Sequence, residues 1–167
     1  HTRYSDVSWA GDVYKRQISN NIKKIKAAIT AIGGYTPDDF ISNKDLEKMV
    51  DTNDEWITAR TGIKKRRILK EKGKATSYLA INAANNLIKK KKLDPKTIDL
   101  VILSTITPDF HGASTAPTVA SEINASNAYA FDINAACSGF LFGMSTATSY
   151  IESVSYTHLR AHETSEY

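Results

Sequence analysis

The sequence predicts an α/β domain with a mainly parallel sheet flanked by helices. Two continuous apolar runs, residues 100–106 and 128–133, are typical of strands that are covered on both faces. Stretches with helical periodicity precede, separate and follow them, so strand and helix alternate through the middle of the chain. This order implies parallel strands joined by right-handed crossovers. The chemistry of such a sheet collects at the carboxyl ends of its strands.

The elements before these runs are expected to be short. Residues 27–34 are apolar with β-branched members and end in glycines, which predicts a strand followed by a turn. Ser42 can cap a helix over residues 44–50. A second short helix is predicted near residues 54–60, ended by Gly62.

A longer helix should follow, capped by Thr76 or Ser77 and ended by Asp94 and Pro95. Its apolar residues recur at helical spacing and form one stripe: Leu79, Ala80, Ala83, Ala84, Leu87 and Ile88. Lysines at 89–92 close this helix, where positive charge complements the helix dipole.

Two further helices are expected around the second apolar run. Ser114 or Thr115 opens a short helix that reaches Ile123. Another helix follows Cys137, and its apolar residues repeat at spacings of four, three and four, which predicts that this side packs inward. These residues are Phe140, Met144, Ala147 and Ile151.

Composition indicates one soluble domain. The 167 residues match the roughly 100 to 200 of an ordinary domain. A hydrophobic content of 41% and a charged content of 24% are ordinary, and no signal peptide or membrane-spanning run is visible. The single cysteine excludes an internal disulfide, so a cytoplasmic location is the default expectation.

The net charge of +4 is distributed unevenly. Between residues 60 and 74 the single acid Glu71 stands against eight basic residues, which would attract phosphates or an acidic partner. Those eight are Arg60, Lys64, Lys65, Arg66, Arg67, Lys70, Lys72 and Lys74. Nucleic acid is not expected as a partner, because no recognition module or interleaved aromatic residues accompany the charge. No metal site is expected, since the pair His158 and His162 lacks the zinc-protease order.

Cys137 lies where the strand run 128–133 gives way to a helix, surrounded by small residues. Small neighbours leave room for an acyl group and let backbone N–H groups turn toward a developing oxyanion. The N-terminus of a helix favours the thiolate form of a cysteine. Cys137 is therefore a candidate nucleophile, although a lone cysteine is often only a small buried hydrophobe.

Three segments together resemble a known family. They are Asp-Thr-Asn-Asp-Glu-Trp-Ile at 51–57, Arg-Thr-Gly-Ile at 60–63, and Asp-Ile-Asn-Ala-Ala-Cys-Ser-Gly-Phe at 132–140. They closely resemble β-ketoacyl-acyl carrier protein synthase III of bacterial type II fatty acid synthesis, over about residues 26–153. The resemblance implies the N-terminal half of a thiolase-like fold, truncated.

The resemblance also implies a reaction in two steps. Cys137 would take a short acyl group from an acyl-coenzyme A, and the acyl group would then condense with malonyl-acyl carrier protein to initiate fatty acid synthesis. No cofactor is implied, only these substrates. The implied partners are acyl carrier protein and acyl-coenzyme A, with no membrane association and with a homodimer in the full-length family member.

Thr52, Trp56 and Arg60 correspond to family positions at the mouth of the substrate tunnel. There the indole would stack on the adenine of coenzyme A and the guanidinium would lie near its phosphates. Without the resemblance, Trp56 would more often be a packing anchor and Arg60 a helix-end cation. The basic residues 64–67 could dock an acidic carrier protein or simply form a solvated loop.

The resemblance covers only part of the family's pattern. Family members have two similar halves, and their catalytic His and Asn belong to the second half, so this chain is expected to be an incomplete enzyme that is inactive alone. Residues 18–153 would form a partial domain between segments 1–17 and 154–167, which both resemble translated adapter sequence.

Three alternatives remain open. A different thiol enzyme would need a histidine near Cys137, and His111 is the residue that could serve. A fragment that binds coenzyme A or carrier protein without chemistry is the second. The third is a long-chain or polyketide-type condensing relative.

Overall fold

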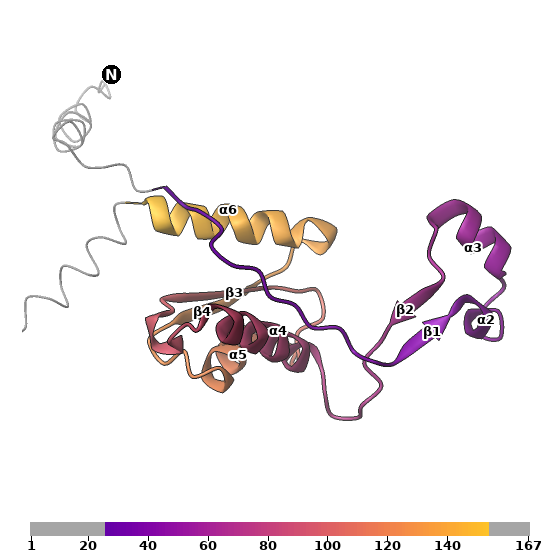
Figure 1. The fold of residues 1–167 in the computed structure, drawn as a ribbon, viewed down its shortest axis with the longest axis horizontal. Helices are drawn as coiled ribbons and strands as arrows, with labels where there is room; N and C mark the ends of the chain where they lie inside the picture. The colour runs from indigo at the N-terminus through magenta and orange to yellow at the C-terminus, as the bar shows by residue number, and fades with distance from the viewer. Residues whose placement is uncertain (1–25, 154–167) are drawn as a thin grey trace, which may run out of the picture. The chain divides into compact units, whose positions relative to one another are not determined.

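The computed structural model describes residues 26–153 (Figure 1). The predicted terminal segments 1–17 and 154–167 lie outside these residues, as do His158 and His162. The chain divides into two units, one of residues 29–146 and another whose described residues are 26–28 and 147–153. Within the second unit the Ala27 N–H donates to Glu152 Oε1 over 3.1 Å.

The first unit is built on a parallel pair of strands, as predicted. Strand β3 (Leu100–Ser104) pairs with β4 (Tyr129–Ile133), with Leu100 opposite Tyr129 and Ser104 opposite Ile133. Helix α5 (Ala116–Glu122) lies in the crossover and contacts both strands. The expected helix from Ser114 or Thr115 to Ile123 is therefore confirmed.

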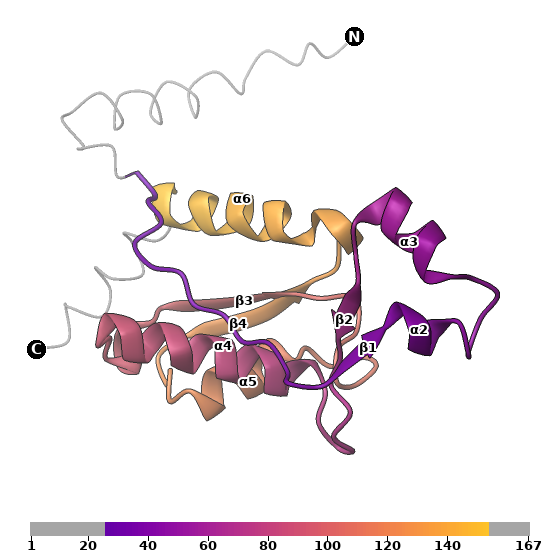
Figure 2. The same ribbon diagram turned by 45° about the vertical axis from the view of Figure 1, so that its right-hand side comes forward.

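The core lies between α5, the strand pair and α4 (Thr76–Lys91). Four residues at and after α5 are buried: Val119, Ala120, Ile123 and Ala125. Three members of the predicted α4 stripe pack against them, namely Ala80, Ala84 and Ile88. Figure 2 shows α4 and α5 on the same side of β3 and β4. Burial of this apolar surface is the main favourable contribution to folding of this unit.

The start of α4 differs from the prediction. Its N-cap position is Ala75, without a side-chain cap, and neither Thr76 nor Ser77 fills that role. Instead Asp109, from the loop after β3, accepts the Ser77 N–H at 2.9 Å. A carboxylate supplied by another loop satisfies the same orphan N–H group that a local cap would satisfy.

The end of α4 agrees with the sequence. Lysines occupy its last turn, and Lys92 ends the helix in the left-handed conformation, with φ of 51°. The 3₁₀ turn η1 (Pro95–Thr97) follows, with Asp94 as its cap.

A smaller antiparallel pair carries two short helices. Strand β1 (Phe40–Ser42) pairs with β2 (Lys65–Arg67), and α2 (Asn43–Leu46) and α3 (Asp54–Thr61) lie between them in the chain. Ser42 caps α2 as predicted, but α2 ends at Leu46 instead of residue 50. The chain turns there, and the Glu47 carboxylate accepts the Asp54 N–H at 2.7 Å, so these residues support the start of α3 instead of extending α2.

The strand predicted over residues 27–34 is absent. A strand needs a hydrogen-bonded neighbour, and within the described part of the chain residues 27–34 join no ladder. The segment instead runs against α4, where a Cβ on Gly33 would lie 2.6 Å from the Cβ of Leu87. Ile29 and Ile32 remain exposed. The prediction of a strand over residues 27–34 was therefore wrong.

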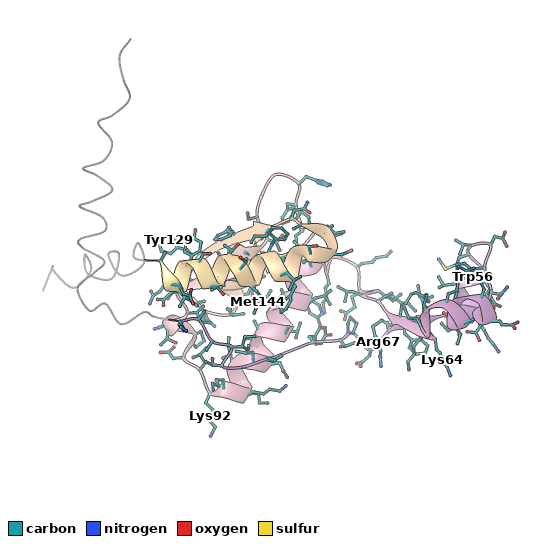
Figure 3. All side chains as sticks on the ribbon, turned by 90° about the horizontal axis from the view of Figure 1, so that it is seen from above. Trp56, Lys64, Arg67, Lys92, Tyr129 and Met144 are labelled. Carbon is teal, nitrogen blue, oxygen red and sulfur yellow. The ribbon has the colours of Figure 1, made fainter. Side chains whose placement is uncertain are left out.

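Helix α6 (Gly139–Glu152) follows the 3₁₀ turn η2 (Ala136–Ser138), but its predicted apolar side does not face inward. Phe140 is 72% exposed, and Met144, labelled in Figure 3, is 37% exposed. Ile151 is also exposed, and Ala147 is half-buried. Neither α6 nor any other helix within residues 26–153 has the length and apolar content to span a bilayer.

The start of α6 packs through its smallest residues. Gly139 and Gly143 face β3, where Ser104 Oγ donates to the Gly139 carbonyl over 2.9 Å. A Cβ on Gly143 would lie 2.7 Å from the same hydroxyl, closer than a side chain allows. The spacing of the large apolar residues therefore predicted the wrong inward face for α6. The helix lies so close to β3 that only residues without a side chain fit at the contact.

A single carboxylate joins β4 to α5. Asp132 accepts the N–H groups of Thr115 and Ala116, both at 2.7 Å, one on each carboxylate oxygen. Thr115 is buried, and its Oγ1 accepts the Asp109 N–H at 2.9 Å. Since Asp109 also caps α4, these bonds link the carboxyl end of the strand pair to the first turns of two helices.

Gly33→Ala should destabilise the protein by about 1–3 kcal/mol, because the new Cβ would overpack against backbone atoms of α4 that cannot rotate away. Gly34→Ala is the matched control, since a Cβ there meets no atom within 4 Å. Urea unfolding of both variants measures the difference. Equal stability of the two would contradict the packing described for Gly33.

Asp132→Asn should destabilise the protein by about 1–3 kcal/mol. An amide offers one acceptor oxygen, so one of the two N–H groups at the start of α5 would face an NH₂ group instead. The free energy of unfolding in urea measures the loss. Asp51→Asn, at an exposed position, is the control and should leave stability within about 0.5 kcal/mol.

Candidate functional site

Cys137 lies in η2, directly after β4 and before α6. It is therefore at the carboxyl end of a parallel strand, where the sequence placed it, and it is exposed. An exposed position removes the alternative that Cys137 is a buried small hydrophobe. A thiol must be accessible to react, so this placement suits a nucleophile.

The residue before the cysteine has an unusual backbone. Ala136 has φ of 44°, in the left-handed region that residues with a Cβ seldom occupy. Such conformations persist where the surrounding structure enforces them, and they cluster at functional sites. The sequence showed only a run of small residues here, which permits the sharp turn but does not reveal it.

Both sides of the cysteine are tied down. The Ser138 N–H donates to the Ala135 carbonyl over 3.0 Å, which closes the 3₁₀ turn around Cys137. One residue further on, the Gly139 carbonyl receives the Ser104 hydroxyl described above. Sequence reasoning missed Ser104, for which the available signal was its position near the carboxyl end of the first apolar run.

Trp56 and Arg60 lie one turn apart on α3. The Arg60 Cζ is 4.9 Å from the centroid of the Trp56 ring, so the guanidinium covers one indole face. Trp56 is 53% exposed, whereas its neighbour Ile57 is buried. Figure 3 shows Trp56 on this helix. A cation and an aromatic ring thus form one exposed unit on α3.

The ends of α3 explain why this pair is displayed. Asn53 caps the helix by accepting the Trp56 N–H at 2.7 Å, and Gly62 ends it with φ of 69°, as predicted. Thr52, half-buried, directly precedes the cap. The structure therefore brings Thr52, Trp56 and Arg60 into one segment. Within residues 26–153, no hydrogen bond, ion pair or ring contact joins that segment to Cys137.

The Asp45 carboxylate forms part of the capping box of the neighbouring helix α2. Hydrogen bonds from the Ser42 hydroxyl and then the Ser42 N–H hold the pKa of Asp45 below its usual value, and Lys48 adds to this effect. A carboxylate with a lowered pKa stabilises the fold above its unfolded-state pKa, and this contribution is lost as pH falls through the folded-state pKa. The capping box of α2 should therefore weaken in acid.

The basic residues 64–67 do not all point into solvent. Arg66 Nη1 donates to Asn43 Oδ1 over 2.8 Å, and Arg67 Nη1 donates to the Asp38 carbonyl over 2.7 Å. Lys64 and Lys65 are exposed. Lys65 Nζ also lies 4.9 Å from the centroid of the Phe40 ring. Three of the four predicted docking charges therefore have structural partners, and the docking role stays a prediction.

His111 lies in a tight turn closed by the bridge between Phe110 and Ala113, with Gly112 at φ of 84°. Phe110 is 70% exposed, and His111 is exposed as well. No hydrogen bond between described residues connects His111 with Cys137, as a thiol–imidazole pair would require. The geometry gives no support to the alternative thiol enzyme.

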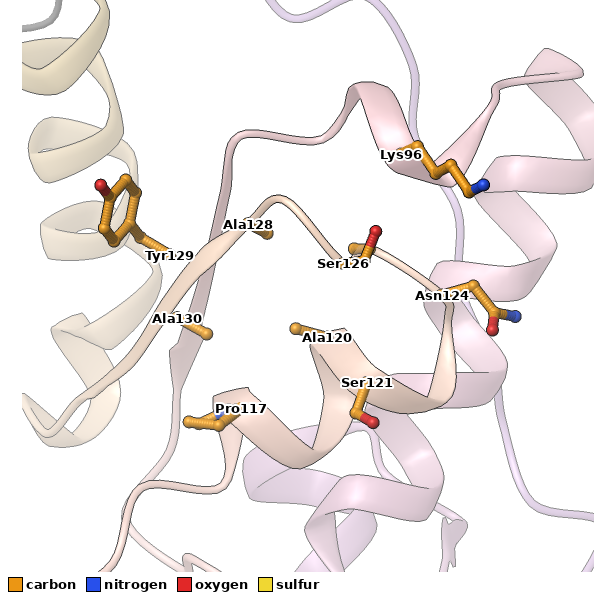
Figure 4. Close-up of a pocket in the computed structure, with 10 residues that line it drawn as sticks. Lys96, Pro117, Ala120, Ser121, Asn124, Ser126, Ala128, Tyr129 and Ala130 are labelled. Carbon is orange, nitrogen blue, oxygen red and sulfur yellow. The ribbon is translucent and has the colours of Figure 1, made fainter. Parts of the chain in front are cut away.

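A hollow of about 590 Å³ lies elsewhere, between α5, the loop after it and the amino end of β4 (Figure 4). Tyr129 and Ala130 at the start of β4 contribute to its wall, together with Lys96 and Asn124. None of the predicted site residues lines it. Since Cys137 follows the opposite end of β4, this hollow is separate from the candidate nucleophile.

Comparison with known proteins gives consistent matches. A family model described as 3-oxoacyl-[acyl-carrier-protein (ACP)] synthase III matches residues 131–159, which include Cys137. The chain is 51% identical over 138 residues to β-ketoacyl-[acyl-carrier-protein] synthase III of Porphyromonas gingivalis, covering 83% of the chain. It is 54% identical over 129 residues to the same enzyme of Chlorobium chlorochromatii, covering 77% of the chain.

Solved structures match as well. The crystal structure of 3-oxoacyl-[acyl-carrier-protein] synthase III from Aquifex aeolicus has 47% identity and a TM-score of 0.70 over 76% of the chain. The priming β-ketosynthase of the R1128 polyketide pathway has 33% identity and a TM-score of 0.72 over 81% of the chain.

The chain spans only about two fifths of these relatives: 41% of the Porphyromonas protein, 39% of the Chlorobium protein and 40% of each crystallised chain. The resemblance predicted from the three sequence segments is confirmed for that part. Over the matched length, the chain is similar to β-ketoacyl-acyl carrier protein synthase III and shares its thiolase-like α/β fold.

Proposed function

We propose that Cys137 is the acyl-accepting nucleophile of a β-ketoacyl-acyl carrier protein synthase III. The observation that carries the proposal is an exposed cysteine between a parallel strand and a helix, held by a left-handed residue before it and a glycine contact after it. The named activity of the similar proteins supports the same chemistry.

The proposed first step is a thioester exchange. The Cys137 thiolate attacks the carbonyl carbon of a short acyl-coenzyme A, and the carbon–sulfur bond to coenzyme A breaks as the new one forms. Coenzyme A leaves as its thiolate and takes up the proton that the cysteine gave up. Thiolates are good nucleophiles and good leaving groups, so the exchange is reversible at little cost. The backbone N–H of Cys137 is the proposed oxyanion donor.

The proposed second step lengthens the acyl chain, and residues 1–167 are not proposed to carry it out alone, because the resemblance assigns its His and Asn to the second half of family members. Malonyl-acyl carrier protein loses carbon dioxide, and the resulting carbanion attacks the acyl carbon on Cys137. A carbon–carbon bond forms, the bond to the cysteine sulfur breaks, and the free thiolate returns. Acyl-coenzyme A and acyl carrier protein are thus the proposed partners, no cofactor takes part, and the cytoplasm is the proposed location.

The proposed coenzyme A site is the exposed pair on α3, with Thr52 beside it. An indole face suits stacking on adenine, and a guanidinium suits the nucleotide phosphates. In the structure Arg60 already covers one face of Trp56, so a nucleotide would use the other face or displace the arginine. Exposed Lys64 and Lys65 are proposed to attract the acidic carrier protein.

Incubating the chain with acetyl-coenzyme A should place one acetyl group on Cys137, seen as a mass increase of the intact protein and mapped to the peptide containing Cys137. Cys137→Ala should remove the adduct, because alanine has no nucleophile. A Ser138→Ala control keeps the thiol and should still be acylated. An adduct that persists without Cys137 would rule out this cysteine as the nucleophile.

Trp56→Ala and Arg60→Ala should each weaken coenzyme A binding by about tenfold or more, since stacking on one base contributes about 1–3 kcal/mol. Calorimetric titration with coenzyme A measures the affinity. Lys72→Ala removes an exposed charge from the same basic segment and is the control, with little expected change. If all three variants bind alike, α3 is not the nucleotide site.

A further inference from the structure

Asn43, the first residue of α2, is a buried polar side chain that none of the proposed chemistry uses. It is 1% exposed. Its amide Nδ2 donates to Asp54 Oδ1 and to the Ile63 carbonyl, both over 2.7 Å, with a longer contact of 3.4 Å to Thr58 Oγ1. Its Oδ1 accepts Arg66 Nη1 at 2.8 Å. The side chain thus uses both donors and its acceptor.

These bonds hold both ends of α3. Asp54 is the first residue of the helix, and Ile63 follows the glycine that ends it. The Asn43 N–H also donates to the Lys64 carbonyl over 3.1 Å, and the acceptor bond reaches Arg66 in β2. One side chain therefore connects the start of α3, the segment after it and the strand that follows.

Apolar packing does little to fix this helix. Ile57 is the buried residue of α3, whereas Trp56 and Arg60 are exposed. A helix that buries one apolar side chain gains little orientation from the hydrophobic effect. The polar bonds from Asn43 are then the main constraint on the direction in which Trp56 and Arg60 project. Breaking them would leave buried polar groups unpaired.

We propose that Asn43 is a positioning residue for nucleotide binding: it orients α3 so that Trp56 and Arg60 meet the adenine nucleotide of coenzyme A. The proposal rests on the proposed function of that pair. Asn43 does not touch the ligand and acts through the orientation of α3. If its loss leaves α3 correctly placed only a tenth of the time, the apparent affinity falls about tenfold.

The test exchanges the side chains of the Asn43–Asp54 pair in two stages, and only the second stage restores the wild-type net charge. Asn43→Asp removes both donors and puts a carboxylate against Asp54, so coenzyme A should bind about tenfold more weakly by calorimetry. Asn43→Asp combined with Asp54→Asn restores an amide–carboxylate pair in the opposite direction at the start of α3, and a carboxylate then faces Arg66, but the Ile63 carbonyl stays without its donor. The double variant should recover part of the lost affinity, which a general loss of stability would not do.

A second readout and a control variant separate the possible results. The labelling rate of Cys137 by a thiol reagent reports on the strand pair and should stay unchanged in every variant. Asn127→Ala is the matched control, because Asn127 also donates a side-chain bond to a carbonyl, that of Lys96, but outside this cluster.

Wild-type affinity in Asn43→Asp would overturn the proposal, as would a double variant that labels normally but stays weak. Should Asn43→Asp fail to fold, the double variant decides alone: folding with recovered affinity supports the proposal, and any other result opposes it. If Trp56→Ala binds coenzyme A normally, the nucleotide site itself is wrong. If Trp56→Ala weakens binding and Asn43→Asp does not, only the positioning role is wrong.

Discussion

The bonds accepted by the Asp132 carboxylate are the interaction on which the Cys137 end of this fold depends. Its two oxygens accept two successive N–H groups at the start of α5, both at 2.7 Å, from a position inside β4. Ionised acceptors form stronger bonds than neutral ones, and two bonds fix direction as well as distance. Because Thr115 then receives the Asp109 N–H, and Asp109 receives the Ser77 N–H, the strand that leads to Cys137 is held in a continuous polar framework.

A different principle operates in the α2 and α3 segment. Little apolar surface is buried there, and Ile57 is its buried apolar side chain among the residues that the structure describes. Asn43 compensates with a saturated set of bonds, as Asp132 does in the larger pair. In both places a buried or half-buried polar side chain with several hydrogen bonds sets the geometry, and apolar contacts add most of the stability only in the larger pair.

The sequence predicted the parallel pair, α3, α5 and the junction at Cys137, since continuous apolar runs and Gly62 are strong local signals. Prediction from the sequence failed where contacts between residues far apart in the chain determine the local structure. Residues 27–34 have strand composition but no ladder, Ala75 replaces a local cap because Asp109 supplies the acceptor, and α6 turns its glycines to β3. The left-handed Ala136 and the role of Asn43 could not be predicted, because both arise from geometry that no local pattern encodes.

The glycine contact between α6 and β3 has a consequence for how this protein can vary. With hydrogen atoms in place of side chains at 139 and 143, the helix side of the contact has no rotamer to adjust, and α6 lies directly against Ser104 and Ile102 of the strand. Any larger residue there must lift the helix, and the sulfur at its base would move with it. Substitutions at Gly139 and Gly143 should therefore alter the reactivity of the Cys137 thiol, although neither glycine has a reactive side chain.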